Sequence, residues 1–291
     1  MKICPNCQNE LNDEFSFCDS CGSKLDVSYF TINKIEEVKQ KEIPFKNAIL
    51  TFILIFISYM YIFPYACVFG YFILNAISPS SFPNPNNLIP ESLTLLNMIL
   101  NELAGVLTLA LMVFFIVKNK QVKEVLGLTK KTKKESIKNT FLQGIITFGL
   151  LYVAITIVSV ISLIFPQVTE DSANQEIVSS FIDSYPIFGF FSVVIMAPIV
   201  EELVFRFFLC KPLEKKKKWL GVIVSALLFG GIHLIASIQG GTFLEDLPSL
   251  LVYVSMGFAL SFRYAQTDNV SSNIIAHAIY NCISFISILS M

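Results

Sequence analysis

Hydrophobic residues in this chain gather into long uninterrupted runs that short polar stretches separate. Seven runs reach the length of about 17–25 residues that an α-helix needs to cross a bilayer. The pattern therefore predicts an all-α polytopic membrane protein with about seven transmembrane helices, preceded by a small N-terminal module. The expected spans are 46–78, 93–117, 139–165, 185–210, 219–238, 248–264 and 271–290.

The first run is longer than one span requires and has Pro64 in its middle. Because proline bends or ends a helix, this run is either one kinked helix or a span followed by a re-entrant or surface turn.

The overall composition supports a membrane protein. Hydrophobic residues make up 54% of the 291 residues, charged residues 15%, and the mean hydropathy is +0.65. A soluble domain is about 45–50% apolar and about 25% charged. With a net charge of −1 and no basic aromatic surface, the chain is not expected to bind nucleic acid. The polar N-terminus does not have the pattern of a signal peptide.

Most basic residues lie in alternate connections between the expected spans. Of the 21 Lys and Arg residues, six lie in 2–46, at or before the start of the first span, eight in 118–138 and five in 211–218, and only Arg206 and Arg263 lie within other spans. The connections 79–92, 166–184 and 239–247 contain none. Because positively charged loops stay in the cytoplasm, we expect a multi-pass protein of the cell membrane with its N-terminus in the cytoplasm and its C-terminus outside.

Four cysteines near the N-terminus have the spacing of a metal site. Cys4 and Cys7 form one CxxC pair, and Cys18 and Cys21 form a second. Two such pairs can supply the four thiolates of a tetrahedral zinc site, and the cytosol keeps thiols reduced. A redox dithiol and chance spacing are the alternatives. So short a segment cannot bury a core, so a structural zinc ion would supply its folding energy.

This segment resembles a minimal zinc ribbon over residues 2–25. Gly22 follows the second pair as in that family, whereas Gln8 replaces the glycine that usually follows the first. The expected organisation is a ribbon at 1–25 and a linker at 26–45. The ribbon is either a module that docks a protein partner or a passive cap.

Two adjacent carboxylates lie within the fourth expected span. Glu202 and Arg206 are four residues apart, so they share a helix face and can form an ion pair. Glu201 points about 100° away from Glu202. One carboxylate can therefore be held ionised by Arg206 while the other faces a cavity as a general base.

The only two histidines of the chain also lie within expected spans. Gly230 and Gly231 precede His233 and allow another helix or a substrate backbone to approach it closely. His277 and Asn281 are four residues apart on one helix face, where an imidazole and a carboxamide can stabilise an oxyanion. Ionisable groups at membrane depth are costly, so they usually face a polar interior and have a function.

These motifs resemble the three sequence blocks of the CPBP family of intramembrane endopeptidases. That family includes the type II CAAX prenyl proteases and bacterial bacteriocin-processing and immunity proteins. Its blocks EExxxR, FxxxH and HxxxN occur here in order, at Glu201, Glu202 and Arg206, at Phe229 and His233, and at His277 and Asn281. The resemblance implies a catalytic membrane core at 139–291, preceded by N-terminal helices and a cytoplasmic loop at 46–138.

The resemblance also implies a role for each residue of these blocks. Glu201 would activate a water molecule that His233 helps to hold, and His277 with Asn281 would stabilise the oxyanion. Glu202 and Arg206 would fix the base and its helix. A catalytic zinc held by the two histidines and a glutamate is the alternative mechanism, although no HExxH motif is present.

The predicted function is an intramembrane endopeptidase that hydrolyses a peptide bond of a membrane-associated protein or peptide. A non-catalytic membrane adaptor or immunity protein is the alternative, and a solute transporter is disfavoured because no inverted repeat is visible. The expected partners are membrane lipid, a peptide or membrane-protein substrate, and a protein bound by the ribbon. The layout is typical of bacteria, so a leader peptide, a pheromone or a membrane-protein tail is expected rather than a prenylated substrate.

Simpler roles for these polar groups remain open at this point. A single histidine in a span can be an interhelical hydrogen bonder, and the Glu–Arg turn can be a structural ion pair. Asn101 and Glu102 form a further polar pair in the second span, and the sequence assigns them no role.

Overall fold

The computed structural model describes residues 2–3, 6–7, 10–11, 17–18, 20–23, 43–126, 133–164 and 172–290. The chain divides between Ile43 and Pro44 into two compact units, which are described separately below. Residues 26–42 of the predicted linker lie outside the described residues. The predicted boundary between 138 and 139 falls inside the second unit and stays a prediction.

The N-terminal unit contains a short strand pair and a tight turn. Strand β1 (Lys2–Ile3) pairs antiparallel with β2 (Glu10–Leu11). In the turn, the Gly22 N–H donates to the carbonyl of Cys18 at 2.8 Å, and the Cys18 N–H donates to the carbonyl of Ser23 at 2.9 Å. Gly22 has a φ of +69°, a conformation that glycine adopts without strain.

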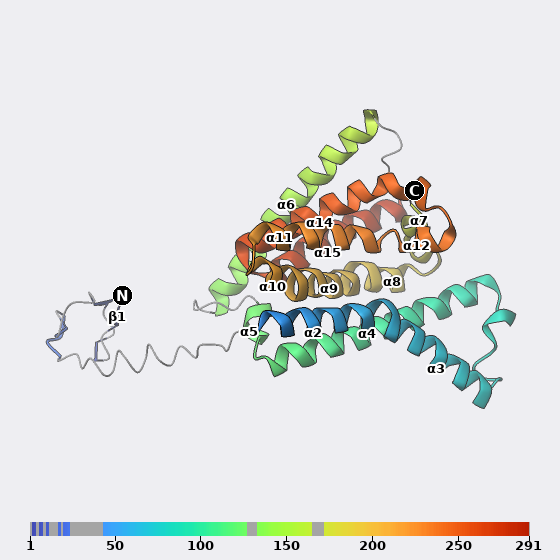
Figure 1. The fold of residues 1–291 in the computed structure, drawn as a ribbon, viewed down its shortest axis with the longest axis horizontal. Helices are drawn as coiled ribbons and strands as arrows, with labels where there is room; N and C mark the ends of the chain where they lie inside the picture. The colour runs from blue at the N-terminus through green and yellow to red at the C-terminus, as the bar shows by residue number, and fades with distance from the viewer. Residues whose placement is uncertain are drawn as a thin grey trace. The chain divides into compact units, whose positions relative to one another are not determined.

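The second unit, which we call the membrane unit, is built from helices (Figure 1). Its α-helices are α2 (Phe45–Ile57), α3 (Phe63–Ile77), α4 (Pro90–Lys118), α5 (Val122–Val125), α6 (Lys133–Ile164), α7 (Ala173–Ser184), α8 (Pro186–Gly189), α9 (Ala197–Glu202), α10 (Lys211–Glu214), α11 (Lys218–Ile232), α12 (Ile235–Gly240), α13 (Phe243–Asp246), α14 (Leu250–Thr267) and α15 (Val270–Leu289). Three π-helical segments, η1 (Ser58–Ile62), η3 (Phe190–Met196) and η4 (Leu203–Cys210), and two 3₁₀ turns, η2 (Pro85–Asn87) and η5 (Leu247–Ser249), complete it.

Seven helical stretches among the described residues are long and apolar enough to cross a membrane, which confirms the predicted number. They are Phe45–Ile77, Pro90–Lys118, Ile137–Ile164, Pro186–Glu214, Trp219–Gly240, Phe243–Thr267 and Val270–Leu289. Large apolar side chains on their outer faces are exposed, as lipid-facing residues must be. The chain is therefore a multi-pass membrane protein.

The first of these stretches is one continuous helix. The π-helical segment η1 joins α2 to α3 without a break, and Pro64 lies in the first turn of α3. Figure 1 shows a bend where α2 passes into α3. A π-helical insertion and a proline are both known causes of kinks, so the run is a kinked helix rather than a span followed by a turn.

Close packing of α11 on α14 depends on two glycines. A Cβ atom at Gly257 of α14 would lie 3.0 Å from both Cα and O of Ala226 in α11. A Cβ atom at Gly230 of α11 would lie 2.5 Å from Cγ2 of Val254 in α14. The expected close approach beside His233 is thus present at Gly230, whereas Gly231 has open space next to it.

The segment α9–η4 lies at the centre of the membrane unit. Every residue from 200 to 210 is buried, including the charged ones. Helices α11, α14 and α15 contact this segment on one side, and α2 and α4 contact it on the other. Figure 1 shows it between these two groups of helices, so its charged side chains point into protein rather than lipid.

The basic connections meet at one end of the membrane unit. Lys211 forms an ion pair with Asp268 at 2.5 Å, the Ser271 hydroxyl donates to the carbonyl of Val125 at 2.5 Å, and Lys216 lies over the ring of Phe45. These contacts bring together the start of α2, the end of α5, α10, the α14–α15 connection and the start of α15. We call this region, which also carries Lys118, Lys138 and Lys215–Lys217, the basic end.

Candidate active site

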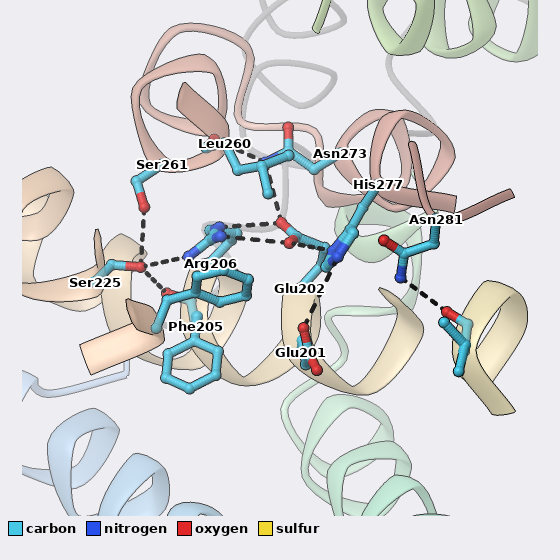
Figure 2. Close-up of polar contacts among 12 residues, drawn as sticks. Glu201, Glu202, Phe205, Arg206, Ser225, Leu260, Ser261, Asn273, His277 and Asn281 are labelled. Atoms are coloured by element: carbon cyan, nitrogen blue, oxygen red, sulfur yellow. Dashed lines mark hydrogen bonds and ion pairs between the residues drawn. The ribbon is translucent and has the colours of Figure 1, made fainter. Parts of the chain in front are cut away.

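The centre of the site is a fully buried ion pair within α9 and η4. Arg206 donates from Nε to Oε2 of Glu202 at 3.0 Å and from Nη2 to Oε1 at 3.4 Å (Figure 2). Neither side chain is accessible to solvent. The pair expected from the four-residue spacing is thus present, with both carboxylate oxygens engaged by one guanidinium.

The remaining face of the Arg206 guanidinium is held by neighbouring helices. Nη1 donates to the hydroxyl of Ser225 in α11 at 3.0 Å, and Ser261 of α14 donates to the same hydroxyl at 3.0 Å. The guanidinium also lies 4.8 Å from the ring centre of Phe229. Hydroxyl, carboxylate and aromatic groups together satisfy a charge that would otherwise be strongly unfavourable at this depth.

Two side chains of α15 complete the surroundings of Glu202. Asn273 donates from Nδ2 to Oε2 of Glu202 at 3.2 Å and to the carbonyl of Leu260 at 2.8 Å. His277 Nδ1 lies 3.1 Å from Oε1 of Glu202. Because a carboxylate oxygen only accepts hydrogen bonds, this contact places the proton on Nδ1.

The surroundings of Glu201 differ from those of Glu202, although the two residues are adjacent in the sequence. The Glu201 carboxylate retains some exposure, and its Oε2 lies 3.9 Å from Nε2 of His277. The His277 imidazole therefore stands between the two carboxylates, as Figure 2 shows. Of the two carboxylates, Glu201 is therefore the one that retains contact with solvent.

His233 sits where α11 ends, in the turn before α12. Its Nδ1 lies 2.8 Å from the carbonyl of Phe229, so this nitrogen carries the proton, and its ring stacks on Tyr253 with centroids 4.3 Å apart. The Phe229 ring is 4.9 Å from the His233 ring and 6.0 Å from the His277 ring. Phe229 thus links the two histidines through ring contacts, and the Nε2 atom of His233 remains as an acceptor.

Asn281 projects from the same helix as His277 but contacts a different element. Its Nδ2 donates to the carbonyl of Val193 in the π-helical segment η3 at 2.8 Å. One amide proton is used in this bond, which leaves the second one for another acceptor. The adjacent Ser192 donates to Glu102 of α4. The unassigned Glu102 thereby gains a partner on η3, whereas Asn101 is exposed.

The thiols of the N-terminal unit form a separate cluster. The sulfur atoms of Cys7, Cys18 and Cys21 all lie within 4.8 Å of one another, and those of Cys7 and Cys18 are 3.6 Å apart. A tetrahedral zinc ion with bonds of about 2.3 Å needs sulfur atoms about 3.8 Å apart, so the spacing suits a metal ion. Hydrogen bonding with Ser23 lowers the pKa of the Cys21 thiol to about 6, which favours the thiolate. Cys4 and Gln8 lie outside the described residues.

Comparisons with known proteins agree with both parts of this description. Residues 183–283 match the model of the type II CAAX prenyl endopeptidase Rce1-like family, and residues 3–25 match that of the zinc-ribbon domain. The predicted resemblance is confirmed, and the Rce1-like match spans all six residues expected at the site.

Curated bacterial proteins share part of the sequence. The "Putative membrane peptidase YdiL" of Bacillus subtilis is 28% identical over 160 residues, which are 55% of this chain and 60% of that protein. The UPF0177 protein YvdC of Lactococcus lactis is 31% identical over 143 residues, 48% of this chain and 50% of that protein. The chain thus spans about half the length of the curated relatives it matches. No solved structure matches the chain.

Several side chains in the region that matches the Rce1-like model were not among the predicted site residues. Asn273 could have been found, because it lies four residues before His277 on the same helix face. Ser225 and Ser261 are small polar residues within spans, and nothing in their local sequence distinguishes them from ordinary helix residues. Tyr253 lies in a helix that has no motif residue, so only the packing of α14 on α11 brings it to His233.

Proposed function

We propose that this protein is an intramembrane peptidase that hydrolyses a peptide bond of a membrane-associated protein or peptide. The observation that carries the proposal is the unequal setting of two adjacent carboxylates. Glu202 is saturated by Arg206, Asn273 and His277, whereas the Glu201 carboxylate lies 3.9 Å from the imidazole and its side chain is 12% exposed. The match to the Rce1-like model and the similarity to the "Putative membrane peptidase YdiL" support the same reaction class.

In the proposed mechanism Glu201 acts as the general base. It takes a proton from a water molecule, and the resulting hydroxide attacks the carbonyl carbon of the scissile bond. When the tetrahedral intermediate breaks down, the carbon–nitrogen bond is cleaved and Glu201 returns the proton to the leaving amine. His233 is suited to hold the water, because its Nε2 atom is an acceptor once Nδ1 donates to Phe229.

His277 and Asn281 act on the oxyanion in this scheme. The bond from Nδ1 to Glu202 fixes the orientation of the imidazole, and Nε2 faces Glu201. The proton that Glu201 takes from water passes to Nε2, which then donates a hydrogen bond to the developing oxyanion. The proton returns through Glu201 to the leaving amine when the carbon–nitrogen bond breaks. Asn281 contributes the amide proton that Val193 does not use.

The mechanism that we propose uses no catalytic metal. Among the described residues, the three ribbon thiols are the one set of Cys, His, Asp and Glu groups close enough to share an ion. The possible ligand atoms of Glu201, His233 and His277 do not form such a set, so these described side chains lack the close common point that a zinc ion needs.

The zinc ribbon is proposed to bind one structural zinc ion through Cys4, Cys7, Cys18 and Cys21 and to dock a protein partner in the cytoplasm. Purified full-length protein is expected to contain about one zinc ion per chain, by elemental analysis. Cys18→Ser should remove it, whereas Cys67→Ser, which changes a buried cysteine in α3, should not. A second zinc ion that disappears with His233→Ala would contradict the metal-free mechanism.

Cleavage itself can be tested in cells. Wild type, Glu201→Gln and the exposed control Glu245→Gln are expressed to equal levels, and the termini of all membrane proteins are compared by mass spectrometry. Glu201→Gln is expected to lower cleavage about 10²–10⁴-fold, the usual contribution of a general base, and to leave the protein folded. New termini present with wild type and Glu245→Gln but not with Glu201→Gln would also name the substrate.

Two outcomes would count against the proposal. Full cleavage by Glu201→Gln would remove this residue from the role of base. Identical termini in all three strains, together with a cellular phenotype that Glu201→Gln still rescues, would favour a non-catalytic adaptor.

A further inference from the structure

A polar cavity of about 260 Å³ lies at the basic end, away from the carboxylates of the site. It is lined by Asn139, Gln143, Arg263, Gln266, Thr267 and Asn269. These residues come from α6, from the end of α14 and from the residue that caps α15. None of the lining side chains is acidic, and Arg263 supplies a positive charge.

Hydrogen bonds around Arg263 leave the cavity rich in donors. Its guanidinium donates to Oε1 of Gln143 at 2.7 Å and to Oε1 of Gln266 at 2.6 Å. Both glutamine side chains therefore use their oxygen atoms to accept from the guanidinium, so their NH₂ groups can donate to another group. The nearby carboxylate of Asp268 is paired with Lys211. The cavity thus combines a fixed cation and amide donors, which is the chemistry that binds phosphate.

The start of α15 adds to this preference. Asn269 caps this helix by accepting a hydrogen bond from the N–H of Ser272 at 3.1 Å, and it donates to Thr140 of α6 at 2.9 Å. The first turn of a long helix carries a partial positive charge that favours a nearby anion. This partial charge adds to the attraction that Arg263 exerts on an anion in the cavity.

The depth of the cavity matches the headgroup layer of a membrane. Arg263 lies four residues before the end of α14, a distance of about 6 Å along the helix. The headgroup layer is about 5–8 Å thick on each side of the hydrocarbon core. In the second half of α14, which also carries Arg263, Phe258 and Phe262 stack on the exposed Trp219 with centroids 6.5 and 6.0 Å apart. Exposed tryptophan at a helix end is typical of the membrane–water interface.

We propose that this cavity binds the phosphate of an anionic phospholipid headgroup. The lysines of the basic end would attract such lipids to this face of the membrane. Arg263 would then hold one of them between α6, α14 and α15, and the lipid would stabilise the packing of these helices. The inference does not depend on the proposed peptidase activity, because none of the lining residues belongs to the site around Glu201.

The test uses purified full-length protein in a neutral detergent. Thermal unfolding is measured with increasing dioctanoyl phosphatidylglycerol, with dioctanoyl phosphatidylcholine and with inorganic phosphate. Phosphatidylglycerol is expected to raise the unfolding temperature in a saturable manner, since a ligand that binds the folded state stabilises it. Phosphatidylcholine should bind more weakly, because its choline group brings a positive charge to a cavity without an acidic group.

Gln266→Glu is the decisive variant. The new carboxylate keeps the bond to Arg263, so the lipid-free protein should remain folded, but it cancels the positive charge. Its affinity for phosphatidylglycerol is expected to fall at least about tenfold, the effect of replacing an attractive charge by a neutral pair at close range. Lys217→Gln removes one positive charge from the same end outside the cavity and should change the affinity less than about twofold.

Three results would overturn the proposed lipid site. Undiminished binding by Gln266→Glu would exclude the cavity, and an equal loss in Lys217→Gln would indicate diffuse charge attraction. Saturable binding of inorganic phosphate that displaces phosphatidylglycerol would assign the cavity to an aqueous phosphate instead.

Discussion

Glu201 and Glu202 are neighbours in the sequence, but they occupy two different kinds of environment. The Glu202 side is closed, because Arg206, Asn273 and His277 fill the hydrogen-bonding positions of its carboxylate and no solvent reaches it. The Glu201 side is more open, with one imidazole 3.9 Å away and residual exposure. A turn of about 100° per residue separates the two sides of the helix.

The comparison shows that one of two adjacent residues in a membrane helix can stabilise the fold while the other is available for a reaction. The closed side ties η4 to α11, α14 and α15 through charged and hydroxyl groups. The open side keeps a carboxylate that accepts no hydrogen bond from another described side chain, and a general base needs such an available oxygen. His277 belongs to both sides, because one ring nitrogen faces each carboxylate. Mutations on the two sides should therefore differ in kind as well as in size.

The largest loss of stability is expected on the closed side. Arg206→Ala leaves the Glu202 carboxylate buried without its counter-charge, and breaking such a pair costs about 3–5 kcal/mol. The matched control is Lys211→Ala, which breaks the ion pair with the exposed Asp268 and should cost at most about 1 kcal/mol. Chemical or thermal unfolding of the purified proteins in detergent measures both. Equal losses would mean that the buried network does not dominate the stability of the membrane unit.

A smaller loss should follow from disturbing the helix contact behind the closed side. Gly257→Ala places a Cβ atom 3.0 Å from backbone atoms of Ala226, next to the Ser225 that binds Arg206. Overpacking of this kind costs about 1–3 kcal/mol. Gly149→Ala is the control, because no atom lies within 4 Å of its added Cβ and the substitution should be neutral or slightly stabilising. If both variants unfold alike, α11 and α14 can separate without penalty.

The sequence predicted the membrane architecture well for a physical reason. A spanning helix must be long and apolar, so hydropathy alone located all seven stretches to within a few residues. The ion pair of Glu202 and Arg206 followed from helix periodicity in the same way. The sequence could not decide between a kinked helix and a re-entrant turn at 46–78. Pro64 indicates a bend in either case, and the π-helical insertion that keeps the helix continuous has no recognisable sequence signal.

The contacts between side chains of different helices in the site were harder to predict from the sequence. Periodicity gives the faces of each helix but not how the faces of two helices are rotated toward one another. Ser225, Ser261 and Tyr253 reach the site because α14 packs closely on α11, which depends on Gly230 and Gly257. Asn281 was predicted beside the oxyanion, and its bond to Val193 adds a contact that no motif indicated. The catalytic roles of these residues remain predictions.

The smallest effect is expected on the open side, at the tyrosine that supports His233. Tyr253→Phe keeps the ring that stacks on the imidazole at 4.3 Å and removes the hydroxyl that contacts Ser172 and Asn174 at 3.2 and 3.3 Å. Loss of such hydrogen bonds costs about 0.5–1.5 kcal/mol, and cleavage should stay near the wild-type level.

Tyr253→Leu provides the contrast, because it removes the ring as well as the hydroxyl. Its cleavage should fall well below that of Tyr253→Phe, since the His233 imidazole loses the surface that orients it. Unfolding measurements show whether both variants remain folded, and the terminus analysis described above measures cleavage. If Phe and Leu impair cleavage equally, the hydroxyl rather than the ring positions His233, and the open side then depends on hydrogen bonding as the closed side does.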